Sequence, residues 1–194
     1  MDEKLLSCGI FIDLRKAFDT IDHNILLYKL HHYGIRGVIN KSFCSYITGR
    51  FQTTQIETKI LKKEAVACGV PQGSVLGLLL FLMYINDISA SSCKVEFFLF
   101  GDDTNFLYED KSLPLLESVV NEELINVCDW LLANKLTQNA KKSNNYYAIF
   151  HLYQRKLSNH AVINLKVFDN EHKAFRNLER KQIMCKISWC LDRQ

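Results

Sequence analysis

The segment Phe97-Phe98-Leu99-Phe100-Gly101-Asp102-Asp103-Thr104-Asn105-Phe106-Leu107-Tyr108 places two adjacent carboxylates between two apolar, aromatic runs. Each run has the length and composition of a β-strand, and the central residues have turn chemistry, so the sequence predicts a β-hairpin with both acids at its tip. Two like charges at the end of buried strands are costly unless a cation neutralises them, which suggests a divalent metal. The alternative is an ordinary hairpin with a solvated Asp-Asp turn.

The composition is that of a globular protein. The chain has 194 residues, of which 48% are hydrophobic and 23% charged, and this predicts one domain with a substantial core. Lys and Arg exceed Asp and Glu by 24 to 21, a balance that permits a nucleic-acid partner without requiring one. The seven cysteines include no Cys-x-x-Cys pair, which favours reduced thiols in an intracellular protein. The most apolar run, residues 75–85, is too short to cross a bilayer, so no membrane segment is expected.

Two further segments have functional character. Asp13 ends the apolar run of residues 7–12, as a carboxylate does where a buried strand reaches a polar site. Residues 69–74, Gly-Val-Pro-Gln-Gly-Ser, form a turn before a long apolar run, residues 75–88. The glycines allow backbone to approach a ligand closely, and the helix behind them offers N–H groups to phosphate or a base. The alternative for this segment is an ordinary loop before a core helix.

The remaining pattern alternates helices and strands. Asp22 is expected to cap a helix that ends at Gly34, and residues 51–58 are expected to form a strand paired with residues 65–67. Two helices should bury apolar residues, the first Leu26, Leu30 and Tyr33, and the second Ile39, Phe43, Tyr46 and Ile47.

A longer helix should begin at Ser112 and Pro114 and pack against a sheet. Its apolar residues at helical spacing are Leu116, Val119, Val120, Leu124, Val127 and Leu131. Further strands are expected at residues 146–150 and 161–168, followed by a short helix near residues 175–180.

Several sequence motifs, taken in their order along the chain, connect these features. Residues 12–23 read Ile-Asp-Leu-Arg-Lys-Ala-Phe-Asp-Thr-Ile-Asp-His, residues 69–77 read Gly-Val-Pro-Gln-Gly-Ser-Val-Leu-Gly and continue to Tyr-Ile-Asn-Asp-Ile, and residues 100–104 read Phe-Gly-Asp-Asp-Thr. The stretch that leads toward a fourth motif contains Cys-Asp-Trp-Leu at residues 128–131, Ala-Asn-Lys-Leu at residues 133–136 and Asn-Ala-Lys-Lys-Ser at residues 139–143. Together they resemble the palm motifs of reverse transcriptases of non-LTR, LINE-like retrotransposons, over roughly the first 150 residues.

The resemblance implies an α+β fold, the polymerase palm, with an antiparallel β-sheet backed by helices. Residues 1–150 would be the palm core and residues 151–194 a degenerate extension toward the primer grip and thumb. Only twelve residues precede Asp13, so we expect a fragment in which fingers and thumb are largely missing. Without the fingers' contacts to the triphosphate, little or no polymerase activity is expected of this chain alone.

The resemblance also implies an RNA-directed DNA polymerase that adds dNTPs to a DNA primer 3′-hydroxyl on an RNA template. Two Mg²⁺ ions, which Mn²⁺ could replace, would assist nucleotidyl transfer, and carboxylate oxygens suit Mg²⁺. Asp13 and Asp102 would be the main metal ligands. Asp103 would stand beside them, and the carbonyl of Leu14 would be a backbone ligand.

Other roles carried over concern the nucleotide. Phe18 matches the aromatic residue that faces the incoming sugar, and Gln72 and Gly73 match the turn that holds nucleotide and template. Lys142 matches the lysine thought to protonate pyrophosphate. This sequence departs from the family pattern at Leu78, where proline is usual, and at Gly101, where alanine or methionine is common.

Several residues have a simpler structural interpretation. Asp19 and Asp22 are expected to be a salt-bridge partner and a helix cap, and His31 and His32 to lie on helix surfaces. Two functional alternatives also stay open. One is a catalytically inactive retrotransposon remnant that at most binds nucleic acid weakly. The other is a different two-metal phosphotransferase, such as a nuclease, which would share the carboxylates but would not need Phe18 or Gln72.

Overall fold

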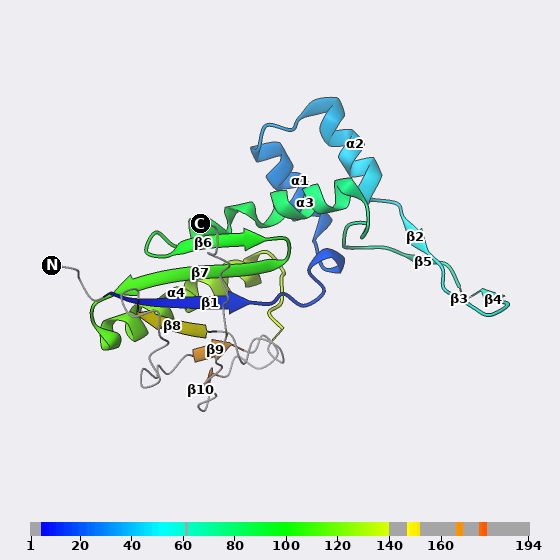
Figure 1. The fold of residues 1–194 in the computed structure, drawn as a ribbon. Helices are drawn as coiled ribbons and strands as arrows, with labels where there is room; N and C mark the ends of the chain where they lie inside the picture. The colour runs from blue at the N-terminus through cyan, green and yellow to red at the C-terminus, as the bar shows by residue number, and fades with distance from the viewer. Residues whose placement is uncertain (1–4, 61, 140–146, 152–165, 169–174, 178–194) are drawn as a thin grey trace, which may run out of the picture. The chain divides into compact units, whose positions relative to one another are not determined.

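The computed structural model describes residues 5–60, 62–139, 147–151, 166–168 and 175–177. The chain divides into two compact units (Figure 1). The first contains residues 1–13, 92–126 and 138–194, and the second residues 14–91 and 127–137. The division into residues 1–150 and 151–194 stays a prediction.

The first unit is built on a four-stranded antiparallel sheet with the strand order β6-β7-β1-β8. Its strands are β1 (Leu6–Ile12), β6 (Glu96–Phe100), β7 (Asp103–Asp110) and β8 (Tyr147–His151). Strand β1 is central and pairs with both β7 and β8. The predicted strand at residues 7–12, the hairpin and the strand at residues 146–150 are therefore confirmed to within a residue or two.

One face of this sheet is core. Leu6, Cys8, Ile10 and Ile12 alternate along β1 and are buried. Ile10 pairs with Phe106, which is 1% exposed and whose ring centroid lies 5.8 Å from that of Phe97. Directly paired residues point to the same side of a sheet, so these side chains form one apolar layer.

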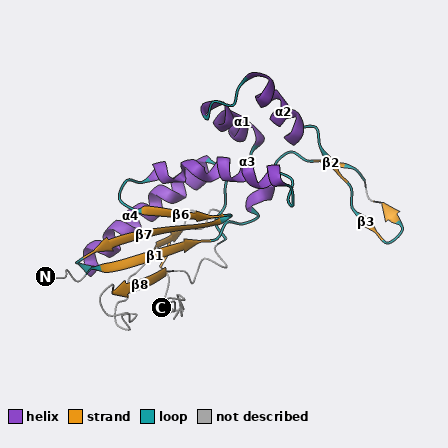
Figure 2. Cartoon of the chain, turned by 45° about the horizontal axis from the view of Figure 1, so that its top comes forward, coloured by secondary structure: helices purple, strands orange, loops and turns teal. Residues whose placement is uncertain are grey.

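Helix α4 (Leu113–Ala133) runs along one face of this sheet in its first turns (Figure 2). Its last turns, from Val127, belong to the second unit. Five of its six predicted core residues are buried, namely Leu116, Val120, Leu124, Val127 and Leu131, and Val119 is half-buried. The predicted amphipathic core helix is confirmed.

The second unit is mainly helical. Helix α1 (His23–His32) begins at Asp22, whose carboxylate accepts hydrogen bonds from the backbone N–H groups of Asn24 and Ile25, so the predicted cap is confirmed. Leu26 and Leu30 are fully buried, but Tyr33 is 41% exposed because it lies after the last helical turn. The prediction that Tyr33 belongs to the buried face is therefore wrong.

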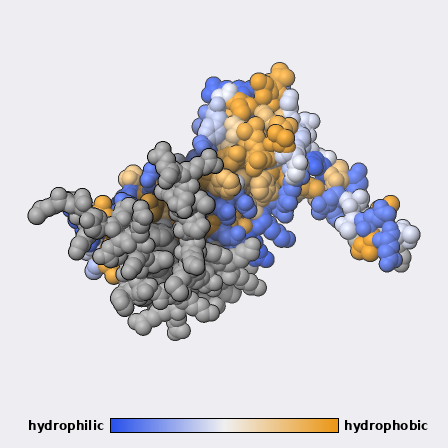
Figure 3. All heavy atoms as spheres, viewed as in Figure 1, coloured by the Kyte–Doolittle hydropathy of each residue, from blue (hydrophilic) through white to orange (hydrophobic). Residues whose placement is uncertain are grey.

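Helix α2 (Gly37–Ile47) contains the four residues predicted for the second helix, and α3 (Val75–Ile85) begins with the predicted apolar run of residues 75–88 and ends three residues before that run does. Short 3₁₀ turns lie at η1 (Ala17–Asp19) and η2 (Asn86–Ser91). Ile47 is buried as predicted, whereas Ile39 is 61% exposed, contrary to the prediction. Figure 3 shows apolar side chains gathered over this part of the molecule, and the exposed ones include Val38, Ile39, Val75, Leu78 and Leu79.

Two short antiparallel ladders lie between α2 and α3 in sequence. Strand β2 (Phe51–Gln52) pairs with β5 (Glu64–Ala65), and β3 (Gln55–Ile56) pairs with β4 (Lys59–Ile60). The expected pairing of residues 51–58 with residues 65–67 is thus right only for β2, where Phe51 pairs with Ala65. A tighter hairpin forms at the other end because Glu57, with φ +54°, turns the chain back early.

The last described strands are β9 (Lys166–Phe168) and β10 (Phe175–Asn177), which pair with each other. The end of the strand predicted at residues 161–168 is confirmed, and its start lies outside the described residues. The short helix expected near residues 175–180 is wrong for residues 175–177, because pairing with β9 draws that segment into an extended ladder.

Candidate active site

Asp13 lies at the end of β1, one of the two inner strands of the sheet in the first unit. It directly follows Ile12, the last residue of β1, so its position at a strand end is as predicted. The Nδ2 amide of Asn139 donates a hydrogen bond of 2.8 Å to Oδ2 of Asp13, and the backbone N–H of Asn139 donates one of 2.9 Å to the Asp13 carbonyl oxygen. Asn139 begins the segment 139–143 that resembles the approach to the fourth motif, but its contact with Asp13 was not predicted, because a contact across 126 positions leaves no local signal.

The two acids of the hairpin lie at its tip. Phe100 pairs with Asp103, so Gly101 and Asp102 are the two turn residues and Asp103 begins β7. Gly101 has φ +62°, the left-handed value that a tight two-residue turn demands at its first position and that glycine adopts without strain.

The side chains of Asp102 and Asp103 are both exposed. Water reaches both groups and screens their repulsion, so the two like charges do not by themselves require a neutralising cation, contrary to the prediction. A metal site is therefore supported only by the chemistry of the three carboxylates and by their positions.

Strand register relates Asp13 to the hairpin. Ile12 pairs with Thr104, and one further step in this antiparallel register sets Asp13 opposite Asp103. Ile12 and Thr104 are buried on the core face, and alternation assigns Asp13 and Asp103 to the other face. Among residues 5–60, 62–139 and the three short described segments, no three His, Cys, Asp or Glu side chains are gathered as a metal site. Convergence of the Asp13 and Asp102 carboxylates stays a prediction.

The donor set fits a hard divalent cation. Asp13, Asp102 and Asp103 offer carboxylate oxygens, the ligands that Mg²⁺ and Mn²⁺ accept. Mg²⁺ at sites that act on phosphates is held by one or two carboxylates together with substrate phosphates rather than by a closed protein cage. Asp13 follows the last residue of β1 and the two other acids lie at the hairpin tip, so all three stand at the same end of the sheet, which agrees with that pattern.

The second unit holds the Gly/Pro turn. Two backbone hydrogen bonds and one side-chain contact hold this turn against the segment that follows Asp13. Gly69 N–H donates to the Ile21 carbonyl, Val70 N–H donates to the Phe18 carbonyl, and the Gly69 carbonyl lies 2.8 Å from Nε2 of His23. A carbonyl oxygen only accepts, so Nε2 of His23 carries the proton. His23 is 8% exposed, and its role was not anticipated from sequence.

Neighbouring backbone atoms lie too close to Gly69 and Gly77 for either residue to carry a side chain. A Cβ on Gly69, where φ is +87°, would lie 2.8 Å from the Asp19 carbonyl oxygen. A Cβ on Gly77 would lie 2.1 Å from the Pro71 carbonyl oxygen, because the first turn of α3 folds back on the loop. Ser74 caps α3 by accepting from Gly77 N–H, and its Oγ donates to the Pro71 carbonyl and lies 3.0 Å from Tyr46 Oη. The motif residues therefore fix the loop's shape.

The predicted nucleotide residues of the second unit differ in exposure. Gln72 is exposed, and its Nε2 donates a 2.8 Å hydrogen bond to Oδ1 of Asp19. Gly73 has φ +76°, and no atom lies within 4 Å of the place of its absent Cβ. Phe18 is half-buried against Phe81, with ring centroids 4.6 Å apart, and Leu14 is 4% exposed. Lys142 lies outside the described residues.

Asp19 and Asp22, for which a structural role was predicted, both have side-chain partners. Asp22 forms an ion pair with Lys135 at 2.6 Å besides capping α1, and the Lys135 hydrogen bond is the main cause that lowers the pKa of Asp22. Asp19 accepts a hydrogen bond from the Gln72 amide, and within the described part of the chain its expected salt bridge is not found. His31 and His32 are exposed on α1, as predicted.

A buried lysine joins α1 to the end of α3. Nζ of Lys29 donates to the Tyr84 carbonyl at 2.7 Å and to Oδ1 of Asp87 at 2.5 Å, and it lies 4.7 Å from the ring centroid of Trp130. Burial lowers the pKa of Lys29, and the Asp87 carboxylate opposes that shift. Sequence reasoning gave this lysine no role. Its contacts are structural.

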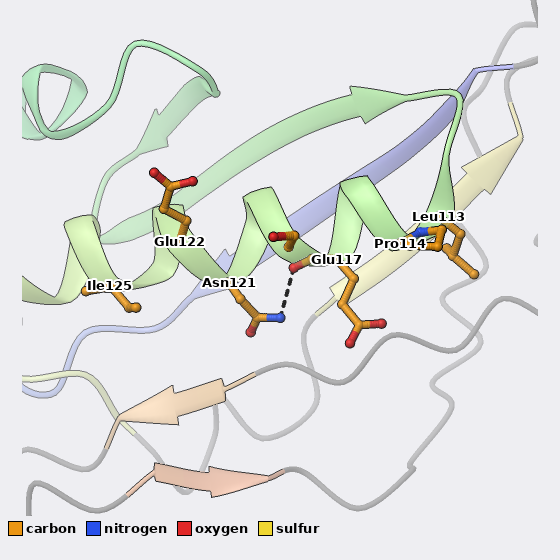
Figure 4. Close-up of a pocket in the computed structure, with 7 residues that line it drawn as sticks. Leu113, Pro114, Glu117, Asn121, Glu122 and Ile125 are labelled. Atoms are coloured by element: carbon orange, nitrogen blue, oxygen red, sulfur yellow. Dashed lines mark hydrogen bonds between the residues drawn. The ribbon is translucent and has the colours of Figure 1, made fainter.

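An open pocket of about 540 Å³ lies on α4 (Figure 4). Its lining residues all lie on α4 and are Leu113, Pro114, Glu117, Ser118, Asn121, Glu122 and Ile125. Asn121 donates its amide to the Glu117 carbonyl within the same helix. None of the candidate site residues lines this pocket.

Within the described part of the chain, no helix has the length and hydropathy needed to span a bilayer.

Comparison with known proteins gives the same assignment as the motifs. The family model described as "Reverse transcriptase (RNA-dependent DNA polymerase)" matches residues 1–181. The chain is 28% identical over 154 residues to a probable RNA-directed DNA polymerase from transposon X-element of Drosophila melanogaster, a match that covers 74% of this chain and 16% of that protein. It is 29% identical to the RNA-directed DNA polymerase from mobile element jockey of the same organism, covering 75% of this chain and 16% of that protein.

A third relative is the retrovirus-related Pol polyprotein from type-1 retrotransposable element R2 of Popillia japonica, 25% identical over 145 residues that cover 69% of this chain and 23% of that protein. The chain thus spans about a sixth to a quarter of the length of these relatives.

A solved structure of telomerase from Candida tropicalis, in complex with the TWJ fragment of telomeric RNA, has a similar fold. Its TM-score is 0.52 at 12% identity, and the match covers 94% of this chain and 31% of that chain. This likeness and the antiparallel sheet backed by a helix confirm the predicted α+β, palm-like fold. The resemblance to polymerases of non-LTR elements is likewise confirmed, and the chain belongs to the reverse transcriptase family.

Proposed function

We propose that this chain carries the catalytic palm of an RNA-directed DNA polymerase, which adds dNTPs to the 3′-hydroxyl of a DNA primer on an RNA template. The observation that carries the proposal is the register of β1 and β7. It sets Asp13, at the end of one strand, opposite the start of the strand that follows the Asp102 turn. Membership of the family and the relatives' names support the substrate class.

Asp13, Asp102 and Asp103 would hold two Mg²⁺ ions, or Mn²⁺ in their place. When bound, such ions activate the attacking hydroxyl and stabilise the charge on the leaving pyrophosphate. Asp102 and Asp103 are exposed and Asp13 is half-buried, so these carboxylates would be accessible to the phosphate groups of a bound nucleotide. The Leu14 carbonyl is proposed as an additional backbone ligand.

The remaining residues would position the nucleotide. Phe18 would face the incoming sugar, and Gln72 and Gly73 would contact nucleotide and template. The fixed shape of the Gly69–Ser74 turn supports this role, because a rigid loop holds a ligand without a large ordering cost. Lys142 is proposed as the acid that protonates the leaving group.

The first test is Mn²⁺ binding to the purified chain, measured by electron paramagnetic resonance. Asp13→Asn and Asp102→Asn should each weaken binding by about 10-fold or more. Asp110→Asn is the matched control. It removes the same charge at the opposite end of β7, where Asp110 accepts from Ser112 N–H, and it should leave Mn²⁺ affinity unchanged. Equal affinity in all four proteins would favour the inactive remnant.

The second test is primer extension on an RNA template with Mg²⁺. Any extension by the chain should be lost in Asp102→Asn and kept in Asp110→Asn. Extension that survives in Asp102→Asn contradicts the proposal. Cleavage of the template or primer without extension would favour the nuclease alternative.

A further inference from the structure

We propose that Asn139 is a positioning residue for the Asp13 carboxylate, orienting it toward the metal ions. The inference rests on the proposed function, since it assigns Asn139 a role only if Asp13 is a metal ligand. Its basis is the pair of hydrogen bonds by which Asn139 contacts Asp13 through both its backbone N–H and its side-chain amide.

The side-chain bond fixes the rotation of the carboxylate. Oδ2 of Asp13 accepts from Nδ2 of Asn139 at 2.8 Å, so the direction of Oδ1 is determined as well. The χ2 torsion of aspartate is otherwise broad and roughly two-fold. A ligand held in one orientation loses less conformational entropy when an ion binds.

The chemistry of the partner matters as much as its place. An amide is a neutral donor, so it orients the carboxylate without cancelling its negative charge. Metal-ligating carboxylates are commonly hydrogen-bonded in this way by outer-shell groups, whose loss costs about 10–100-fold in metal affinity.

The backbone hydrogen bond of Asn139 makes it possible to test the positioning role of its side chain separately from its contribution to folding. Asn139 N–H donates to the Asp13 carbonyl oxygen at 2.9 Å, and this bond survives any side-chain substitution at position 139 except proline. Asn139→Ala therefore removes the amide and keeps the backbone contact. Asn139→Leu keeps the side-chain volume and also removes the donor.

The experiment measures Mn²⁺ affinity and melting temperature for the 194-residue chain and five variants. Asn139→Ala and Asn139→Leu should each bind Mn²⁺ about 10-fold more weakly than the unaltered chain, and Asp13→Asn at least as weakly. Ser7→Ala is the matched control. Ser7 lies on β1, the strand that Asp13 follows, but at the opposite end, and the substitution removes its 2.7 Å hydrogen bond to the Glu109 carboxylate of β7. Ser7→Ala should lower the melting temperature and leave the Mn²⁺ affinity unchanged. Asp110→Asn should also leave the Mn²⁺ affinity unchanged.

The outcomes separate this inference from the proposed function. Mn²⁺ affinity that falls in Asp13→Asn but not in either Asn139 variant overturns the positioning role and leaves the metal site standing. Affinity that is unchanged in Asp13→Asn overturns both. A lower melting temperature in the Asn139 variants, with affinity equal to that of Ser7→Ala, identifies Asn139 as a purely structural residue.

Discussion

Nε2 of His23, the first residue of α1, donates a hydrogen bond of 2.8 Å to the carbonyl oxygen of Gly69, which opens the Gly/Pro turn 46 positions later. The contact is buried, so its loss would leave a carbonyl oxygen without a partner. Together with the Gly69 N–H bond to Ile21, it holds the turn against the segment that contains Phe18. The shape of this loop is therefore set by tertiary contacts as well as by its glycines.

Gly69→Ala should destabilise the second unit strongly. The substitution forces a Cβ to within 2.8 Å of the Asp19 carbonyl oxygen at a residue with φ +87°. Gly34→Ala is the matched control, because Gly34 has the same φ and no atom within 4 Å of its Cβ position. We expect Gly34→Ala to lower the unfolding free energy by about 1–2 kcal/mol and Gly69→Ala by a further 1–3 kcal/mol, roughly, as read from urea unfolding. Equal losses in the two variants would mean that the close approach is relieved by a small backbone shift.

Substitutions of Asp22 should separate its two roles. Asp22→Asn keeps an oxygen that can cap α1 but loses the ion pair with Lys135, whereas Asp22→Ala loses both. The cap should contribute about 1 kcal/mol and the ion pair about 0.2–1 kcal/mol, because the Lys135 side chain is 65% exposed. Differences in unfolding free energy among the three proteins measure the two contributions.

The ion-pair part should depend on pH in a defined direction. The pKa of Asp22 is lowered from 3.8 in the folded state, so the unfolded chain binds a proton first as pH falls. The advantage of the unaltered chain over Asp22→Asn should be fully present well above pH 3.8. It should be lost as pH falls through the lowered folded-state pKa. An advantage that does not change between pH 6 and the acid limit of folding would contradict this assignment.

Thr104→Val should leave stability unchanged or raise it. Thr104 is fully buried, and among the described residues its Oγ1 has no hydrogen-bond partner. An unpaired buried hydroxyl costs about 1–3 kcal/mol, and valine fills nearly the same volume without it. Ser7→Ala, which removes a paired hydroxyl from the neighbouring strand, should by comparison lose about 1–2 kcal/mol. A marked drop in the melting temperature of Thr104→Val would indicate an ordered water bound to the hydroxyl.

Phe18→Val tests the proposed sugar contact in any context in which the chain supports extension. A phenyl ring beneath the incoming sugar leaves no room for a 2′-hydroxyl, so the smaller side chain should raise ribonucleotide incorporation while deoxynucleotide use stays similar or falls. The loss of packing against Phe81 should also cost about 1–4 kcal/mol. The measurements are the ratio of dNTP to rNTP incorporation and the melting temperature. An unchanged ratio with a lower melting temperature would assign Phe18 to the core alone.

The sequence by itself determined the features that depend on short range. The hairpin around Asp102, the capping of α1 by Asp22 and the helix after Ser74 were all predicted, because turns and caps are made by side chains within a few residues of the backbone they contact. The amphipathic spacing of α4 likewise predicted its buried face. The family motifs, read in their order, predicted the family.

Only the tertiary structure decided which residues distant in sequence meet and which faces are covered. Periodicity predicted an inward role for Ile39 and Tyr33, yet both are exposed, since a pattern marks an apolar face without specifying what packs on it. The exposure of Asp102 and Asp103 and the contacts of Asp13 with Asn139 and of His23 with Gly69 follow from strand register and loop packing. Those depend on contacts across tens of positions, and no local propensity encodes them.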